Sequence, residues 1–297
     1  MLTFKPVTLE DRPVIELFLN KIQPRFCLHT FQGLYIWRHQ ICLQYAVYKE
    51  FIVFKTCFEY RYNYLFPIGK GDYNEVLNEI KNDAETLNFS YAVYQILEEQ
   101  LPIIEQFAKV NKMFIKPVRD YFEYWYDTQK MIHLPGKKLQ PKRNHINYFI
   151  KNFIWKYEPI TSKNVSQCID FVKNWESLKN EPDNAFLHED DLLFIDSLSS
   201  MDILNLEGGM LKIENEIMAL GLGCRLNSEV FMILFEKARG DIKGAYPMIF
   251  QQFVKHHCFN YKYVSRLEDV GDEGLRKAKL SYHPDILQPV YKMTPQV

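Results

Sequence analysis

Two stretches of this chain are alike, and this internal similarity constrains the fold more than any other feature of the sequence. "FKPVTLEDRPVIELFLNKI" begins at Phe4, and "YEPITSKNVSQCIDFVKNW" begins at Tyr157. The matching pairs are Phe4 with Tyr157, Pro6 with Pro159, Val7 with Ile160, Thr8 with Thr161 and Phe18 with Phe171. Each stretch predicts a short strand, a Thr suited to an N-cap and an amphipathic helix. Strand-turn-helix is common enough to match by chance, but an offset of about half the chain favours a duplicated domain.

Length and composition agree with two folded domains. The chain has 297 residues, 47% of them hydrophobic and 15% aromatic, which is enough to bury a large core. The formal net charge of -1 demands no polyanionic partner overall, although a local basic patch would still attract one. The start has no signal peptide and no run approaches 18 apolar residues, so we expect a cytoplasmic protein without a transmembrane segment.

The cysteines indicate neither disulfides nor a metal site. The six thiols form no CxxC pair, which is typical of buried free cysteines in a reducing compartment. His256-His257-Cys258 resembles a metal cluster, but adjacent side chains point apart on a helix or a strand and rarely share a metal. We therefore expect no metal and no resident cofactor.

The order of predicted elements in the second half is that of the N-acetyltransferase (GNAT) fold. A strand near Ile154–Thr161 and a helix near Asn164–Lys179 are followed by a second helix in "HEDDLLFIDSLSS". Four β-rich runs come next: "MDILNL", "GMLKIEN", "EIMALGLGCRL" and "EVFMILFEKA". They are followed by a helix in "GAYPMIFQQFVKHH", a strand in "YKYVSRL", a helix in "DEGLRKAKLSY" and a last strand in "PVYKM".

The first half is compatible with the same order. Its second helix would be "TFQGLYIWRHQ", and its central helix would be "GDYNEVLNEIKNDAETLN". Its antiparallel meander would be formed by "QYAVYKEFIVFKTC" and "YRYNYLFPI". The sequence thus predicts an α+β protein of two tandem GNAT-like domains, each with a mixed, mostly antiparallel sheet flanked by helices. We expect an N-terminal domain at 1–135, a basic linker at 136–153 and a C-terminal domain at 154–297 that carries the probable active cleft.

The stretch from Thr128 to Tyr157 is the most basic part of the chain, with seven Lys or Arg and no acid. Such a run is often a solvated connector. Here Lys142, Arg143 and His145 lie beside Tyr148 and an adjacent Phe, a mixture that suits a nucleic-acid backbone with an unstacked base.

A late helix in "GDEGLRKAKLSYHP" has the same two interpretations. At about 100° per residue, Leu275, Ala278 and Tyr282 fall on one face that we expect to pack inward. Arg276 and Lys279 are surface neighbours, and they form either a wet cationic side or a grip for phosphate.

The stretch "FEKARGDIKGAYPMIF" offers a third candidate site. GNAT enzymes that use acetyl-CoA open their central helix with [QR]xxGx[GA], whose amides hold pyrophosphate. Gly244, Ala245 and Tyr246 follow Gly240 with a different spacing, so an acyl-CoA donor is less expected, although the helix start still suits an anion. Glu236, at the end of a predicted strand, is either a general base in a cleft or an ion-pair partner of a Lys.

Together, "LPGKKLQPKRNHINYF", "FEKA", "GAYP" and "GDEGLRKAKLSYHP" resemble bacterial proteins related to the C-terminal catalytic domain of phosphatidylglycerol lysyltransferase. That family is similar to the Fem-type aminoacyltransferases. Both groups carry a late G-L-x-x-[FY]-K-x-x-[FY]-x-P segment, which this chain matches except that Ala278 replaces an aromatic; the matching positions are Gly274, Leu275, Lys279, Tyr282 and Pro284.

The resemblance implies a tandem GNAT fold and the transfer of an aminoacyl group from charged tRNA to a hydroxyl or amine, with no acetyl-CoA. It places on Lys279 a contact with the donor's phosphate or carbonyl oxygen. The lipid-modifying enzymes carry a large membrane domain that is not seen here, so the expected acceptor is soluble or a lipid reached from the surface.

The sequence therefore predicts an aminoacyl or acyl transferase. Arg276 and Lys279 would hold the donor, Lys142 and Arg143 would guide nucleic acid, and Glu236 or His283 would take the proton of the attacking group. Two alternatives stay open: a GNAT enzyme with acyl-CoA as its donor, and a binding protein that has kept the fold without the chemistry.

Overall fold

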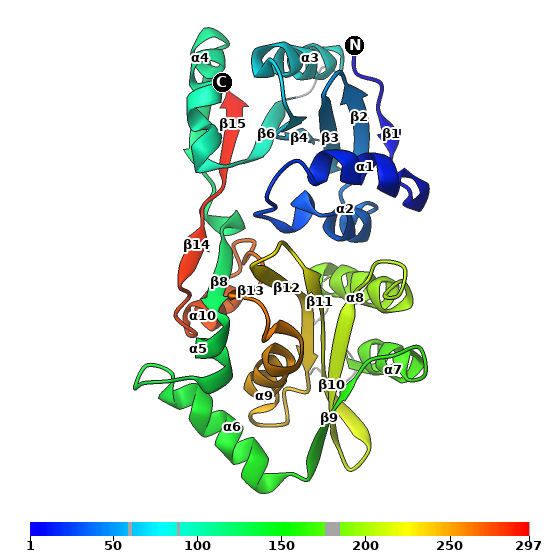
Figure 1. Cartoon of the computed structure of the whole chain (residues 1–297), viewed down its shortest axis with the longest axis vertical. Coiled ribbons are helices and arrows are strands. Elements are labelled where there is room, and N and C mark those ends of the chain that lie inside the picture. Colours follow the sequence, from blue (N-terminus) through cyan, green and yellow to red (C-terminus); the bar gives the residue numbers. More distant parts are fainter. Residues whose placement is uncertain (59–60, 88–89, 176–184, 297) are drawn as a thin grey trace. The chain divides into compact units, whose positions relative to one another are not determined.

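The computed structural model describes residues 1–58, 61–87, 90–175 and 185–296. The chain divides into two compact units, and neither is one continuous segment. Unit 1 comprises Met1–Glu123, Glu268–Asp272 and Gln288–Val297, and unit 2 comprises Tyr124–Leu267 and Glu273–Leu287. Each unit is a mixed sheet with helices (Figure 1), which confirms the predicted α+β class.

Unit 1 follows the predicted order of elements. Its helices are α1 (Arg12–Leu19), α2 (Phe31–Trp37), α3 (Tyr73–Thr86) and α4 (Leu101–Val110). Its strands are β1 (Lys5–Pro6), β2 (Gln44–Tyr48), β3 (Phe51–Phe58), β4 (Arg61–Leu65), β5 (Ile68–Gly69), β6 (Tyr91–Ile96), β7 (Met113–Pro117) and, from the C-terminus, β15 (Tyr291–Pro295).

Unit 2 repeats this order after two additional helices. Its helices are α5 (Thr128–His133), α6 (Gln140–Asn152), α7 (Val165–Trp175), α8 (Ala185–Ser199), α9 (Ala245–Phe253) and α10 (Glu273–Leu280). Its strands are β8 (Glu123–Asp127), β9 (Trp155–Pro159), β10 (Glu207–Ile213), β11 (Glu216–Arg225), β12 (Val230–Ala238), β13 (Tyr263–Ser265) and β14 (Ile286–Gln288).

The two sheets have the same strand order because the halves of the chain exchange their last strands. One sheet runs β1-β2-β3-β4-β6-β15-β7, and the other runs β9-β10-β11-β12-β13-β8-β14. The strand β15 pairs antiparallel with both β6 and β7, and β8 pairs antiparallel with β13. Each half therefore completes the sheet of the other.

The exchanged strands carry core residues. Met293 of β15 is fully buried in the core of unit 1 with Val53 and Ile80. Tyr124 and Tyr126 of β8 are fully buried in the core of unit 2. Burying one side chain of this size contributes about 1.5–3 kcal/mol, so the exchange contributes substantially to both cores.

The duplication extends to single hydrogen bonds at the first turn of each unit. In unit 1 the Asp11 carboxylate accepts the amide of Thr8 at 2.9 Å. In unit 2 the side-chain oxygen of Asn164 accepts the amide of Thr161 at 2.7 Å. Both Thr residues stand at the expected turns, but in each turn the side chain three residues later is the acceptor.

Several details differ from the expectations. The compact units do not follow the boundaries 1–135, 136–153 and 154–297, because the strand exchange places 124–135 in unit 2 and 288–297 in unit 1. Most of the expected linker is helix α6 of unit 2. The run "MDILNL", expected as a strand, is mainly a turn before β10. The helix expected near Asn164–Lys179 is α7 over Val165–Trp175, and the rest of the expected range lies outside the described residues.

Candidate functional site

A buried ion pair closes the space between two parallel strands of unit 2. The strand β12 pairs with β13 only from Val230 to Met232, and β12 then continues to Ala238. Arg266 directly follows β13, and its Nε and Nη2 lie 2.9 and 2.7 Å from Oε2 of Glu236 on β12. The ion pair therefore bridges the two chain segments beyond their last backbone pairing, at the carboxyl end of β13. Ligands of open sheets often bind at such positions.

The ion pair is largely removed from water. The side chains of Glu236 and Arg266 are 8% and 15% exposed. Burial opposes the charge of Arg266, but the Glu236 carboxylate outweighs it, so the pKa of the guanidinium lies above its usual value. Nη1 of Arg266 and Oε1 of Glu236 are buried and have no hydrogen-bond partner among the described residues.

Aromatic rings and a second cation surround this pair. The Arg266 guanidinium carbon lies 4.4 Å from the ring centroid of Phe250 and 5.3 Å from that of Tyr282. The Lys142 Nζ lies 4.1 Å from the centroid of the same Tyr282 ring. Burial, and after it the positive charge of Arg266, holds the pKa of Lys142 below its ordinary value. Two cations thus share one aromatic ring next to a single carboxylate.

Helix α10 turns its cationic side inward. Lys279 is 9% exposed, its Nζ lies 5.8 Å from the ring centroid of Tyr124, and its carbonyl accepts the Tyr126 hydroxyl at 2.9 Å. Leu275 and Ala278 are exposed, so the inward face expected from them and Tyr282 is wrong. Of those three only Tyr282 is buried.

Arg276, on the same helix, is half-buried, and its exposure is intermediate between those of Lys277 and Lys279. Of the two predicted donor-binding cations, Lys279 is therefore buried and Arg276 is partly buried. This inward placement distinguishes them from the exposed Lys277.

The start of helix α9 lies beside Glu236 in the sequence and near it in space. Gly244 precedes the helix with φ +91°, and a Cβ there would lie 2.4 Å from the His145 carbonyl oxygen. In the described part of the chain no side chain caps this helix. Tyr246 is 42% exposed. Burial raises the pKa of the Tyr246 hydroxyl, a hydrogen bond with the Ala238 backbone lowers it, and Glu236 raises it further.

Three predicted site residues have other surroundings. Arg143 donates to the carbonyls of Leu134 and, at 2.8 Å, Gly136, so it holds the turn before α6. His145 is exposed on α6. His283 is exposed in a left-handed conformation after α10, and its carbonyl accepts from Lys130 at 2.6 Å.

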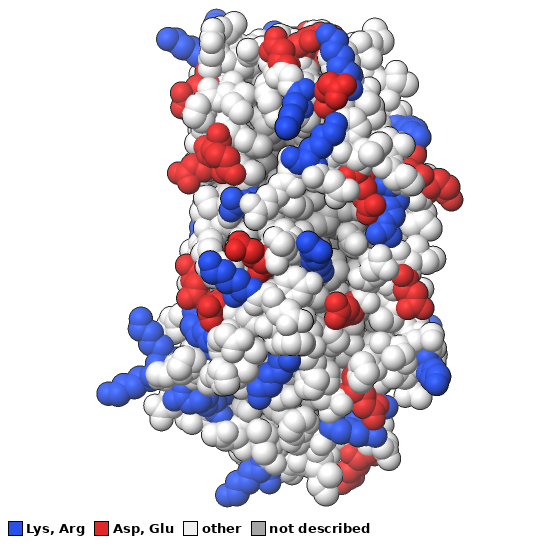
Figure 2. All heavy atoms as spheres, in the orientation of Figure 1, with Lys and Arg blue, Asp and Glu red and all other residues white. Residues whose placement is uncertain are grey.

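The expected basic surface lies on helix α6 and the turn before it. Lys137, Lys138 and Lys151 are exposed there. Lys243, from the loop before α9, adds a fourth cation and lies 4.7 Å from the ring centroid of the exposed Tyr148. Figure 2 shows Lys and Arg side chains gathered over this part of unit 2. Tyr148 of the expected linker therefore lies beside a cation, which comes from the loop before α9.

Sequence reasoning missed Arg266. It stands in "YKYVSRL", for which the sequence predicts a strand and no site residue. A charged residue directly after a predicted buried strand was the available signal, because the carboxyl ends of parallel strands are common binding positions. Its partner Glu236 was identified, but with a Lys as the expected counter-ion.

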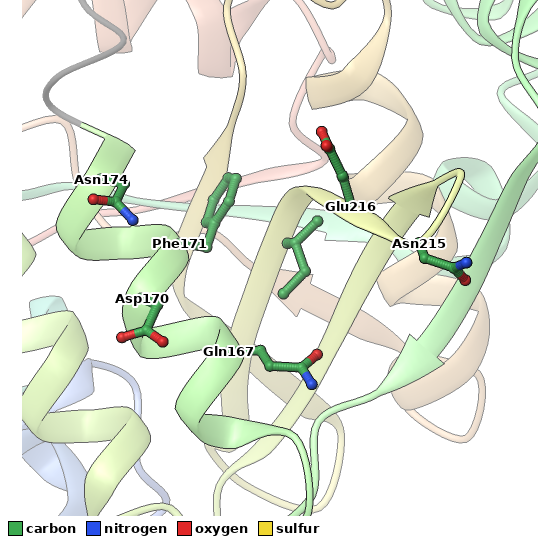
Figure 3. A pocket seen from close by; sticks show the side chains of 7 residues that line it. Gln167, Asp170, Phe171, Asn174, Asn215 and Glu216 are labelled. Carbon is green, nitrogen blue, oxygen red and sulfur yellow. The ribbon is translucent and has the colours of Figure 1, made fainter.

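Other polar groups of unit 2 lie in different places. His257 joins Glu207 and the Tyr157 hydroxyl through its two ring nitrogens, each at 2.9 Å. A hollow of about 320 Å³ lies between α7 and the β10–β11 turn. It is lined by carboxylate and amide side chains, among them Asp170 and Glu216 (Figure 3), and so does not suit an anionic ligand.

The two units share one strand order and form a tandem GNAT-like fold. The chain belongs to the family described as phosphatidylglycerol lysyltransferase, C-terminal, whose profile matches residues 20–294. No helix among the described residues combines the length and the apolar character needed to cross a bilayer.

Solved structures share this fold. A conserved protein of unknown function from Bacteroides thetaiotaomicron VPI-5482 is 32% identical over 100% of both chains, with a TM-score of 0.89. The C-terminal domain of a putative lysylphosphatidylglycerol synthetase from Agrobacterium fabrum is 12% identical, with 97% and 92% of the two chains covered and a TM-score of 0.68. FemX is 8% identical, with 98% and 96% covered and a TM-score of 0.64. The last two likenesses concern the fold.

Proposed function

We propose that this protein transfers an aminoacyl group from charged tRNA to an amine or hydroxyl acceptor. The observation that carries the proposal is the group of cations held inside unit 2 by three separate segments: Lys142 of α6, Arg266 after β13 and Lys279 of α10. Cations that are wholly or partly withdrawn from water suit an anionic donor and the negative charge that develops during acyl transfer. Membership of the phosphatidylglycerol lysyltransferase C-terminal family supports this choice of donor.

The reaction needs little chemistry from side chains because an aminoacyl ester is already reactive. The acceptor's nitrogen or oxygen attacks the ester carbonyl, a new C–N or C–O bond forms, and the bond to the ribose oxygen breaks. The proton lost by the acceptor ends on that ribose oxygen. Positioning the two reactants and stabilising the oxyanion with Lys279 and Arg266 supply the rate.

The basic surface of α6 holds the nucleic acid in this proposal. Lys137, Lys138, Lys151 and Lys243 are placed to contact backbone phosphates, and Tyr148 offers a ring on which a base can stack. Arg143 supports this surface indirectly, since it fixes the turn that carries the first two lysines.

A filter-binding assay with charged and uncharged tRNA over a salt series tests the proposal. We expect affinity to fall steeply with salt, because phosphate contacts release counterions. Replacing Lys137, Lys138 and Lys151 together by Ala should flatten the salt dependence, since each phosphate contact contributes about 0.7–0.9 to the slope. Glu10, Glu16 and Glu50 of unit 1, changed to Gln, form the control set.

Titration of the protein with acetyl-CoA is the second test of the proposed function. Tight, stoichiometric binding of acetyl-CoA without binding of charged tRNA would replace this proposal by an acyl-CoA-dependent transferase. Binding of neither ligand would indicate a protein that keeps the fold without the transfer reaction.

A further inference from the structure

The Glu236–Arg266 pair keeps one hydrogen-bond acceptor and one donor unused. Both contacts between the side chains involve Oε2 of Glu236, through Nε and Nη2 of Arg266. Oε1 and Nη1 are buried and have no partner among the described residues. Leaving such charged groups unsatisfied costs more than the about 1–3 kcal/mol of a neutral group, so the position favours a ligand that supplies both partners.

The described residues that contact the pair or its aromatic neighbours include cations and rings. The Lys142 ammonium lies over the ring of Tyr282. For the hydroxyls of Tyr126 and Tyr282, the charge of Glu236 raises the pKa and the charge of Arg266 lowers it, while burial is the largest cause of the raised pKa. Tyr246, from the start of α9, is close enough for Glu236 and Arg266 to act on its hydroxyl, and it is 42% exposed. Tyr246 and Lys142 are thus partly exposed residues near the pair.

We propose that Glu236 and Arg266 together recognise the α-aminoacyl group of the donor, with Glu236 Oε1 accepting from its ammonium and Arg266 Nη1 donating to its carbonyl oxygen. This inference rests on the proposed function and names the chemical group that the site selects. Ammonium and carbonyl stand on adjacent carbon atoms of an α-amino ester, and the ion pair has one acceptor and one donor without partners among the described residues. The ion pair through Oε2 remains intact when the ligand binds.

The pair would then act as a selectivity device. A simple acyl ester offers the carbonyl but no ammonium, so it leaves the Glu236 oxygen buried and unpaired. Sites built around a polar group of the substrate reject analogues that lack this group far better than apolar pockets reject a missing methylene. Free amino acids carry the same ammonium, whereas a peptidyl or N-acetylated donor does not.

The experiment compares three ligands on the wild-type protein: aminoacyl-tRNA, the same tRNA with the amino group acetylated, and the deacylated tRNA. We expect the free amine to bind at least about tenfold more tightly than the acetylated form, as expected for a hydrogen bond between charged partners. Equal affinities for these two ligands, with deacylated tRNA weaker than both, would overturn this inference and leave the proposed function standing. No binding of any tRNA would overturn the proposed function itself.

Two variants test whether Glu236 causes the preference for the free amine. Glu236→Gln keeps the shape but removes the charge, and we expect the ratio of affinities between free and acetylated donor to fall toward one. Asp241→Asn is the matched control, since Asp241 pairs with Arg239 in the nearby loop and should leave the ratio unchanged. An unchanged ratio in Glu236→Gln would refute the assignment to Glu236. The ligand comparison on the wild-type protein decides the ammonium preference even if the variant folds poorly.

Discussion

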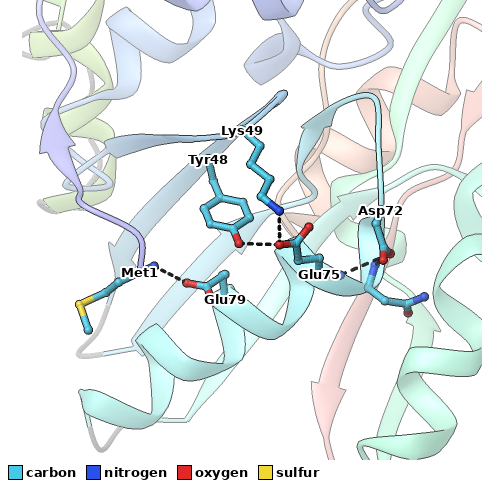
Figure 4. A network of polar contacts seen from close by, with 7 residues as sticks. Met1, Tyr48, Lys49, Asp72, Glu75 and Glu79 are labelled. Atoms are coloured by element: carbon cyan, nitrogen blue, oxygen red, sulfur yellow. Dashed lines mark hydrogen bonds and ion pairs between the residues drawn. The ribbon is translucent and has the colours of Figure 1, made fainter.

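The two units share a strand order but differ at the corresponding helix start. In unit 1 the Asp72 carboxylate caps α3 and accepts the amide of Asn74 at 2.9 Å and that of Glu75 at 3.4 Å. Figure 4 shows this cap beside Glu75, which accepts from Tyr48 and Lys49. In unit 2 the equivalent helix α9 follows Gly244, and in the described chain it has no side-chain cap. In unit 1 the protein's own carboxylate thus occupies a helix start of the kind that suits an anion, and α9 has no such side-chain cap in the described chain.

The parallel strands differ in the same sense. In unit 1 β4 pairs with β6 from Tyr62 to Leu65, and Phe66 continues the pairing by donating to the Tyr94 carbonyl at 2.8 Å. The Phe66 ring stacks on Tyr73, with centroids 5.2 Å apart. In unit 2 an ion pair stands beyond the last strand pair. Unit 1 therefore fills this position with apolar packing, whereas unit 2 has charged groups there.

The largest effect should follow the loss of Arg266. Arg266→Ala leaves Glu236 buried without its counter-ion, so we expect unfolding to become easier by about 3–5 kcal/mol in urea denaturation. Replacing both partners, as Arg266→Met with Glu236→Leu, should restore most of this stability and give unit 2 a closed position like that of unit 1. A loss below about 1 kcal/mol for Arg266→Ala would show that water already solvates the pair.

Lys279 should matter far more than its neighbour Lys277. We expect Lys279→Met to lower the rate of aminoacyl transfer by about 100-fold, the effect of removing one donor to a developing oxyanion. Lys277→Met is the matched control, because Lys277 is exposed on the same helix. Single-turnover transfer rates measure the difference, and equal losses in both variants would refute a special role for the buried cation.

Gly244 should tolerate no side chain. Gly244→Ala combines a φ of +91° with a Cβ 2.4 Å from the His145 carbonyl oxygen, so we expect a loss of about 2 kcal/mol. Gly240→Ala, four residues earlier, meets no described atom within 4 Å and should change the unfolding midpoint little. Similar melting temperatures for the two variants would contradict this reading of the loop.

A buried histidine should make unit 1 sensitive to mild acid. Burial, with the charge of Arg25 as a second cause, lowers the pKa of His29 to about 4. Because the unfolded chain binds a proton near pH 6.5 and the folded chain does not, this contribution is present above pH 6.5 and is lost between pH 6.5 and 4. We expect about 2 kcal/mol of stability to disappear between pH 7 and 5, measured by urea denaturation at each pH. A His29→Gln variant should lose less over this range.

The smallest effect should come from the cap of α3. Asp72→Ala should cost about 1 kcal/mol, the usual contribution of an N-cap, because two amides lose their acceptor. Aminoacyl transfer should stay within twofold of the wild type, since the site lies in unit 2. A larger change in the transfer rate, at unchanged helix content by circular dichroism, would show that the start of α3 takes part in the reaction.

Local sequence was sufficient for most of the elements. Alternation and helical periodicity located the meander of unit 1, the helix α3 and the late cationic helix, because each depends on side chains a few residues apart. The same local view failed for Arg266, which meets Glu236 only through the pairing of β12 with β13. It failed also for the inward face of α10, since the apolar positions Leu275 and Ala278 indicated the other side.

The sequence by itself determined the duplication, the α+β class and the concentration of positive charge on α6 and α10. Only the tertiary structure decided which half supplies the last strand of each sheet and which cations are buried. Strand partners are chosen by pairing between distant segments, which no local period encodes. Lys279 is buried because the exchanged strand β8 brings Tyr124 and Tyr126 to α10, so the environment of this cation depends on contacts that form only when the chain is folded.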